Sequence, residues 1–492
     1  MKRTAIPATV AVVIALAAGC TVGPRYVRPA TPAPAPDAWR MQPPWQQAAP
    51  KDAIPKGTWW AIFNDTRLND YEQQLLKVNP SLAAAKDRLE QARSLARVAS
   101  SNFFPQLSTD PNGLRQRISG NRQLTGAAPP LYPVDQGVYN IPFSLSYEAD
   151  LFGSVRSNMR AANATLQATA ADLQNAQLVL TAELAADYFT LRELDAEMQV
   201  VQSSVEIEQK GLDLVRRRHD GGIASGLEVA QQASLLDGTK TQLSLVEQQR
   251  KQYEHAIAVL TGNPPSTFNV PAFALVGAPP PIPLGIPSDL LERRPDIASA
   301  ERTVAYQNAQ VGLARAAFYP LLSLTSSNGY QSRDITTLLS TPSAFWTVGA
   351  DLLQPVFNGG RNRANLAAAK ASYDNAVENY RQTVLTAFQQ VEDGLSGLDT
   401  LSRAAATQQA AVEDSQHALQ IANNRYVGGV TNYLDVITAQ STLLADQRLA
   451  VQLLGQRMVT SVYLVKALGG GWDAAQLQKE QVHPKAIQTI QQ

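Results

Sequence analysis

Residues 143–152 read FSLSYEADLF, and this stretch decides how the rest of the chain is interpreted. Apolar and polar side chains alternate through it, and two of the polar ones are acids, Glu148 and Asp150. A period of two predicts a β-strand with one apolar face and one polar face. A similar alternation in residues 346–352 places Asp351 on a polar face.

The pattern predicts strands at about residues 138–152, 318–330 and 345–357. A fourth strand, at about residues 103–118, is predicted mainly because residues 103–108 resemble residues 318–323. In a soluble protein their apolar face would pack on a core, but four strands offer no second sheet. In lipid, an open sheet leaves edge groups unpaired at several kcal/mol each, so only a closed barrel is stable. Three copies would supply about twelve strands. We therefore expect a trimeric barrel with a mildly cation-preferring lumen lined by Glu148, Asp150 and Asp351.

Proline usage divides the rest of the chain. No proline occurs between Pro142 and Pro264 or between Pro355 and Pro484, so each stretch can hold long helices. The expected helices cover residues 154–218, 226–262, 295–316, 361–427 and 432–468, with further helices before residue 103. As a single helix, residues 154–218 would extend roughly 100 Å. That length argues against an ordinary soluble helical bundle.

The two halves are copies of each other. Phe103-Phe104-Pro105 parallels Phe318-Tyr319-Pro320, and Leu151-Phe152 parallels Val356-Phe357. Gly221-Gly222 likewise matches Gly428-Gly429. Leucines at seven-residue spacing, with a four-residue stutter between Leu180 and Leu184, add a coiled-coil signature. We expect repeats at residues 57–262 and 288–470, a proline-rich link at 263–287 and a tail at 471–492.

The N-terminus has the pattern of an export signal. Lys2 and Arg3 precede an apolar run that stops at Gly19-Cys20, which predicts a signal peptide over residues 1–19. Cys20 is the only cysteine of the chain, and we expect it to carry a covalent lipid rather than a free thiol. Nine prolines between Thr21 and Lys56 make residues 20–56 an extended tether after the lipidated residue.

Composition excludes several classes of protein. Lys+Arg and Asp+Glu are both 42, so no basic surface for nucleic acid is indicated. One cysteine and four histidines give no disulfide framework and no metal site. No nucleophile elbow or phosphate loop occurs, so we expect no enzyme activity and no cofactor besides the lipid.

The Gly-Gly turns are the candidate functional sites. Glycines allow the chain to reverse between helices, which explains them structurally. The polar groups around them could hold a duct shut or contact a partner protein. The candidate gate or partner-contact residues are Arg216, Arg217, Arg218, Asp220, Gly221, Gly222, Arg425, Tyr426, Gly428, Gly429, Asn432, Tyr433 and Asp435.

Several motifs together resemble the outer-membrane efflux lipoproteins of the TolC-like superfamily, NodT/OprM type. They are Cys20-Thr21-Val22-Gly23-Pro24, Trp59-Trp60, Glu292-Arg293-Arg294-Pro295-Asp296, Asn432-Tyr433-Leu434 and Gly469-Gly470-Gly471-Trp472. The Glu-Arg-Arg-Pro-Asp run also fits ordinary helix-starting chemistry. Members of the family often carry an acid before the Asn-Tyr-Leu element, where this chain has Thr431.

The resemblance implies an α+β TolC-like fold. It predicts a homotrimer whose 12-stranded outer-membrane barrel continues into a coiled-coil α-helical barrel across the periplasm. It also implies N-acyl and S-diacylglycerol lipid on Cys20, a periplasmic adaptor protein and an inner-membrane pump of the RND type. The expected function is export of drugs or other small toxic solutes. The alternatives are a duct for a type I secretion system, an autonomous porin and a lipid-anchored enzyme.

Overall fold

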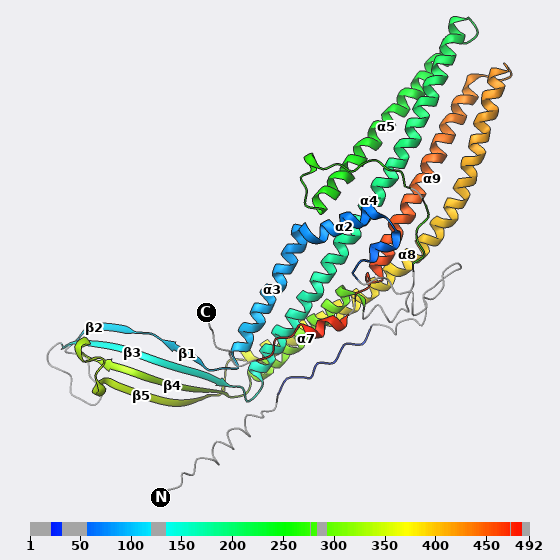
Figure 1. The fold of residues 1–492 in the computed structure, drawn as a ribbon. Helices are drawn as coiled ribbons and strands as arrows, with labels where there is room; N and C mark the ends of the chain where they lie inside the picture. Colours follow the sequence, from blue (N-terminus) through cyan, green and yellow to red (C-terminus); the bar gives the residue numbers. More distant parts are fainter. Residues whose placement is uncertain are drawn as a thin grey trace.

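The computed structural model describes residues 21–31, 57–119, 134–275, 277–282, 293–472 and 474–484. The expected signal peptide, Cys20 and much of the tether lie outside these residues. The molecule is elongated, with an antiparallel sheet at one end and two helical hairpins at the other (Figure 1). Helices make up most of the chain.

The helices come in pairs of equal length. Both α4 and α8 have 67 residues, α5 and α9 have 35, and α3 and α7 have 22. Their bounds are α2 Thr66–Val78, α3 Pro80–Ser101, α4 Ser154–Asp220, α5 Gly226–Leu260, α7 Pro295–Ala316, α8 Arg361–Val427 and α9 Tyr433–Ala467. Left-handed glycines, Gly153 and Gly360, precede the two longest helices. Among the described residues, no helix is both long and apolar enough to cross a membrane.

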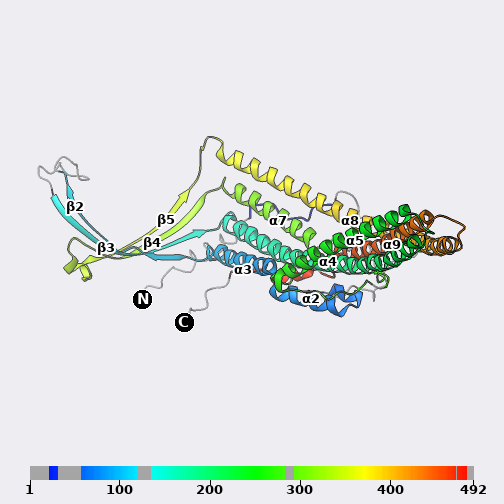
Figure 2. The same cartoon turned by 90° about the horizontal axis from the view of Figure 1, so that it is seen from above.

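Four helices lie side by side at each level of the helical part. Towards the sheet, neighbouring helices follow the order α3, α4, α7, α8, and towards the hairpin tips the order is α5, α4, α9, α8. Figure 2 shows α3 and α8 on opposite sides of α4 and α7, so the row is open. One edge of the row is α3 and α5, and the other is α8.

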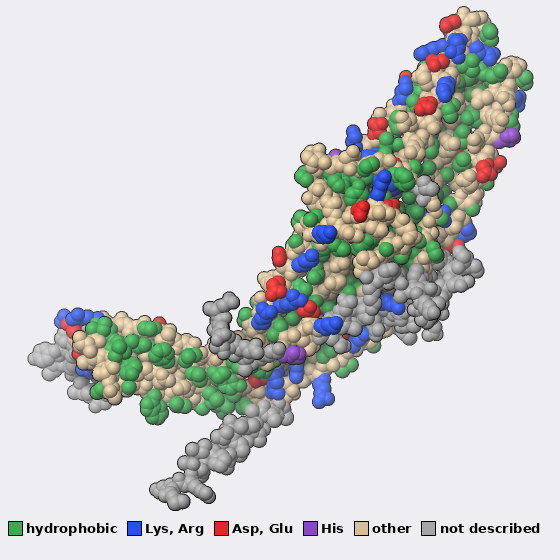
Figure 3. All heavy atoms as spheres, in the orientation of Figure 1, with side chains coloured by type: hydrophobic (Ala, Val, Ile, Leu, Met, Phe, Trp, Pro, Cys, Tyr) green, Lys and Arg blue, Asp and Glu red, His purple; other side chains and the backbone are tan. Residues whose placement is uncertain are grey.

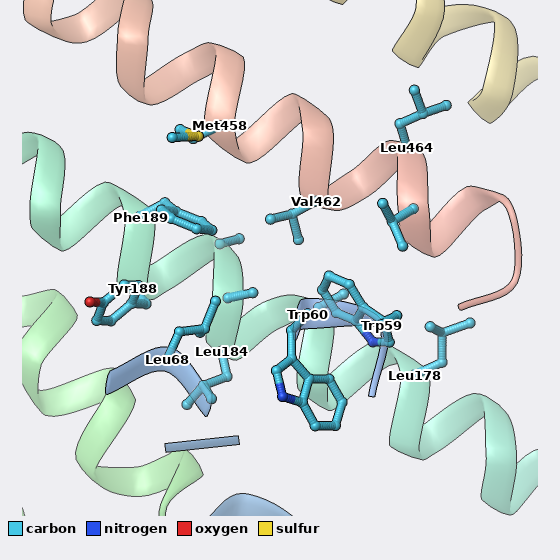
Figure 4. Packing of buried hydrophobic residues seen from close by; sticks show 14 of the residues in the cluster. Trp59, Trp60, Leu68, Leu178, Leu184, Tyr188, Phe189, Met458, Val462 and Leu464 are labelled. Carbon is cyan, nitrogen blue, oxygen red and sulfur yellow. The ribbon is translucent and has the colours of Figure 1, made fainter. Parts of the chain in front are cut away.

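The main core lies where the short and long helices meet. Trp59 and Trp60, in the 3-10 helix η1 Trp59–Phe63, are buried against α4 and α9 (Figure 4). Trp59 Nε1 donates a hydrogen bond to Thr181 Oγ1 at 3.1 Å. Leu184 and Leu191 from the seven-residue pattern are fully buried here. The repeated leucines therefore face the core, as expected for a helical seam.

A buried charge network fixes the proline-rich link to α4 and α5. Asp195 accepts hydrogen bonds from Arg192 Nη1 at 2.8 Å and from Arg250 Nε at 2.6 Å. The same arginines donate to backbone oxygens of the link, at Pro271 and Val270. Because each buried charge has a partner, the cost of desolvation is offset.

The Glu-Arg-Arg-Pro-Asp run marks the start of α7. Pro295 occupies the first helical position, and Arg294 forms a two-pronged pair with the Asp296 carboxylate, at 3.0 and 2.6 Å. Arg294 also donates to the carbonyl of Ala467 at 2.9 Å, which ties this helix start to the end of α9. The structural interpretation of this motif is consistent with these contacts.

The sheet differs in detail from the expected strands. It has five strands, β1 Gln106–Thr109, β2 Asn112–Ile118, β3 Val134–Ala149, β4 Leu321–Ser332 and β5 Ala344–Leu353, paired in the order β1-β3-β4-β5 with β2 also on β3. The prediction of a single first strand over residues 103–118 was wrong. Asp110-Pro111 interrupts it, because proline has no N–H to donate to a neighbouring strand. β1 and β2 thus share one edge position, so the sheet is still four strands wide.

Residues 21–31 are not a free tether, which corrects the sequence interpretation. The Tyr26 hydroxyl donates to Glu301 Oε1 at 2.7 Å, and Arg302 lies over the Tyr26 ring at 5.5 Å. Asn308 Nδ2 donates to the carbonyl of Pro24 at 3.1 Å. An aromatic ring and its polar partners on α7 hold this segment in place despite its prolines.

Candidate functional site

The sheet presents one polar face and one apolar face. Directly paired residues of an antiparallel sheet share a face. The polar rows across β3, β4 and β5 are Glu148–Ser323–Asp351, Ser146–Thr325–Gly349 and Ser144–Ser327–Thr347. The apolar face carries Phe143, Leu145, Tyr147, Leu322, Leu324, Trp346, Val348 and Leu352. Figure 3 shows many hydrophobic side chains, among other side chains and backbone, over the visible surface of the sheet.

The three acids proposed for the lumen are not equivalent. Glu148 and Asp351 flank Ser323 in one row of the polar face. Asp150 follows the end of β3, which stops three residues earlier than expected. Its carboxylate accepts hydrogen bonds from the backbone N–H and the Nε of Arg156, both at 2.9 Å. Asp150 therefore stabilises the start of α4, where a negative charge is favourable.

The two sides of the sheet are open edges. β5 pairs only with β4, and β1 and β2 pair only with β3, among the strands of the described residues. Trp346 and Val348 on β5 are 78% and 74% exposed. Exposed apolar side chains on an unpaired edge indicate a surface that another chain or lipid covers.

Both Gly-Gly turns lie at the tips of the helical hairpins, far from the sheet (Figure 1). Gly222 and Gly429 have φ of +74° and +73°, so each turn needs a left-handed residue. The preceding glycines close the helices: the N–H groups of Gly221 and Gly428 donate to carbonyls four residues back. These glycines are explained by chain reversal.

Three of the candidate tip residues meet inside one chain. The rings of Tyr426 and Tyr433 lie 4.7 Å apart, and Arg218 sits over the Tyr426 ring at 4.6 Å. Tyr433 is only 2% exposed, and its hydroxyl lies so close to Gly211 that an added Cβ would be 2.8 Å away. This cluster joins the α8–α9 hairpin to α4.

The other candidate tip residues face solvent. Arg216, Arg217, Asp220, Arg425 and Asn432 are exposed, and none of them forms an ion pair within the described part of the chain. Thr431 donates its hydroxyl hydrogen to Asp435, so this carboxylate has a local partner. The exposed groups are available to another protein chain.

The sequence analysis missed a buried polar cluster beneath Tyr433. Glu208 on α4 accepts a hydrogen bond from the Thr239 hydroxyl of α5 at 3.1 Å, and Gln232 donates to the carbonyl of Glu208 at 2.9 Å. Burial raises the pKa of Glu208, and the bond from Thr239 partly opposes this shift. A groove of about 640 Å³ between α5 and α9 lies alongside. Polar residues at core positions of the coiled-coil pattern are the feature of the sequence that could have predicted this cluster.

The segment that follows Cys20 reaches the boundary between sheet and helices. The N–H of Val22 donates to the carbonyl of Phe152 at 3.4 Å, and Thr21 packs against Gly153, just before α4 begins. Cys20 itself lies outside the described residues. Among the described residues, no group of histidines, cysteines and acids could hold a metal ion.

Known proteins share this arrangement. The sequence profile of the outer membrane efflux protein family matches residues 72–263 and 286–470, more than half of the chain. The chain belongs to this family. The two matched stretches coincide with the two helix–strand repeats. It is therefore the outer-membrane channel of an efflux system, with a TolC-like α+β fold that extends into the periplasm.

Relatives of this efflux protein agree in sequence and structure. It is 34% identical to the pyoverdine export outer membrane protein OpmQ of Pseudomonas aeruginosa, over 90% of this chain and 94% of that one. Identity to OprJ of the same species is 32%, over 94% and 95%. The outer-membrane channel OprN superposes with a TM-score of 0.84 at 28% identity, over 92% of this chain and 100% of that one. These relatives are channel and efflux proteins, not enzymes.

Proposed function

We propose that three copies form a continuous duct, a 12-stranded barrel in the outer membrane continued by a ring of helices. The observation that carries this proposal is a two-faced sheet, four strands wide, with both edges open beside helices of roughly 100 Å. Closure between copies removes the open edges and gives a polar lumen with an apolar exterior.

Two neighbouring serines on β4 test the assignment of the faces. Ser326 pairs with Leu145 and Val348 on the apolar face, and Ser327 pairs with Ser144 and Thr347 on the polar face. Ser326→Lys should sharply lower the amount of trimer in the outer membrane, because a lysine at the bilayer midplane costs about 2–4 kcal/mol. Ser327→Lys should insert normally and shift the reversal potential towards anions. Equal insertion of both variants would refute this arrangement.

We propose that the duct is lipid-anchored at Cys20. Its neighbour Thr21 lies where the sheet meets the helices, so acyl chains on Cys20 would start at the level at which the apolar face begins. The mass of the intact protein tests this proposal. The wild type should carry three acyl chains, and Cys20→Ser should carry none. Unmodified wild-type protein would contradict it.

We propose small organic molecules as cargo, delivered through a periplasmic adaptor protein and an inner-membrane pump of the RND type. Relatives named for pyoverdine export, toluene efflux and antibiotic efflux support this class of cargo. The exposed Arg216, Arg217 and Arg425 at the tips provide polar contacts for the adaptor. Deleting the gene should raise cellular accumulation of a fluorescent efflux dye, and the wild-type gene should restore efflux. Unchanged accumulation would contradict this function.

A further inference from the structure

The connection between β5 and α8 contains two unusually exposed apolar side chains. Val356 is 93% exposed and Phe357 is 91% exposed, the highest values among the large hydrophobic residues described. We call residues 356–357 the second elbow. Full exposure of two adjacent apolar side chains indicates a surface that is covered in the working assembly.

The internal repeat shows what covers the matching elbow. In the first repeat, Leu151-Phe152 occupies the same place between a strand and a long helix. There, Phe152 stacks on Tyr319, with ring centroids 4.9 Å apart and planes at 21°. Tyr319 lies two residues before the start of β4, the strand paired with β3. We call residues 151–152 the first elbow. It is covered by Tyr319, the residue that leads into the neighbouring strand β4.

The counterpart of Tyr319 in the first repeat is Phe104. The segment Phe103-Phe104-Pro105 corresponds to Phe318-Tyr319-Pro320, and Phe104 leads into β1 as Tyr319 leads into β4. However, β1 and β5 lie at opposite edges of the sheet, separated by β3 and β4. Three strand spacings amount to about 14 Å. Phe104 and Phe357 of one chain therefore do not occupy neighbouring positions.

We infer that the second elbow of one copy packs on Phe104 of the next copy, as Phe152 packs on Tyr319 within the chain. This inference rests on the proposed trimer and specifies its interface. β5 then pairs with β1 and β2 of the neighbouring copy. The partner is a second copy of this chain because only a second copy brings a β1 edge beside a β5 edge.

The faces of the sheet give an independent check. Antiparallel pairing with Phe357 opposite Phe104 places Leu352 opposite Thr109. Thr109 is paired with Phe143 of the apolar face, so the apolar surface continues across the junction. A shift by one residue would put Leu352 beside the polar face. The pairing derived from the elbows therefore preserves the two-faced character of the sheet.

Chemical cross-linking in native membranes tests the contact. The double variant Phe104→Cys with Phe357→Cys, treated with a short bifunctional maleimide, should give covalent oligomers on a denaturing gel. The matched control, Phe152→Cys with Tyr319→Cys, joins two positions of the same chain and should remain monomeric. Each single cysteine variant should also remain monomeric.

The other outcomes overturn the inference in distinguishable ways. If native mass spectrometry shows trimers but the double variant gives no cross-linked species, the elbow contact is wrong and the proposed channel stands. Efficient quenching of Phe357→Trp fluorescence by brominated lipid would show that membrane lipid covers the elbow instead. If the wild-type protein is a monomer, both the contact and the proposed trimer fail.

A variant that keeps the aromatic ring, Phe357→Tyr, should retain the dissociation temperature of the trimer, whereas Phe357→Ser should lower it.

Discussion

Replacing Tyr433 by alanine should shift the channel towards its open state. The ring is buried at the tip, 4.7 Å from Tyr426, and its hydroxyl approaches Gly211 of α4. Tyr426 belongs to the same hairpin as Tyr433, so the contact that joins the two hairpins is the one between Tyr433 and Gly211 on α4. Burying roughly 20–60 Å² of apolar surface between the hairpins contributes about 0.5–1.5 kcal/mol. If the contact exists only while the two hairpins are together, its loss changes the open-to-closed ratio by roughly two- to tenfold, since 1.4 kcal/mol corresponds to a factor of ten.

Single-channel recording in planar bilayers measures this ratio. Tyr433→Ala should raise the open probability, and Tyr433→Phe should stay near the wild type because it keeps the ring. Tyr380 provides a matched control, since it is 0% exposed but lies on α8 roughly 70 Å from the tip. Tyr380→Ala should destabilise the fold without opening the channel. Wild-type behaviour of Tyr433→Ala, or equal opening by Tyr380→Ala, would refute the reasoning.

Three further changes have distinct expected results. Burial raises the pKa of Glu72 well above its usual value, so the native state keeps a proton that the unfolded chain releases; stability should fall as pH rises above about 4.3, and a Glu72→Gln variant with the same slope in thermal unfolding would contradict this. Asp195→Asn leaves Arg192 and Arg250 without their carboxylate and should cost about 3–5 kcal/mol in denaturant unfolding, whereas a loss below about 1 kcal/mol would mean that the network is not buried. Asp351→Asn should weaken cation preference in reversal-potential measurements, and an unchanged potential would remove it from the lumen.

Local rules predicted the long helices well. α4 was expected over residues 154–218 and covers Ser154–Asp220, and α8 has the expected bounds of 361 and 427. Proline-free stretches limited by left-handed glycines determine these ends, and both signals lie in the sequence. The two faces of the sheet could also be predicted from the sequence, because an alternation with a period of two needs no tertiary information.

Tertiary partners decided the features that the sequence analysis missed. The N-terminal segment has the composition of a tether, and only the pairing of Tyr26 with Glu301, far away in sequence, holds it on α7. At the tips, Tyr433 was predicted among the candidate gate or partner-contact residues, and the sequence did not show that it is buried within one chain. Its exposure depends on how α9 packs on α4, which seven-residue spacing does not specify.

The mass of the detergent-extracted protein, measured by native mass spectrometry with Cys20→Ser alongside, tests the central claim most directly. The account predicts a trimer of acylated chains for the wild type and a trimer without lipid for the variant. A stable monomer would contradict the account, because the open edges of β1 and β5 would then be covered without a second copy of the chain.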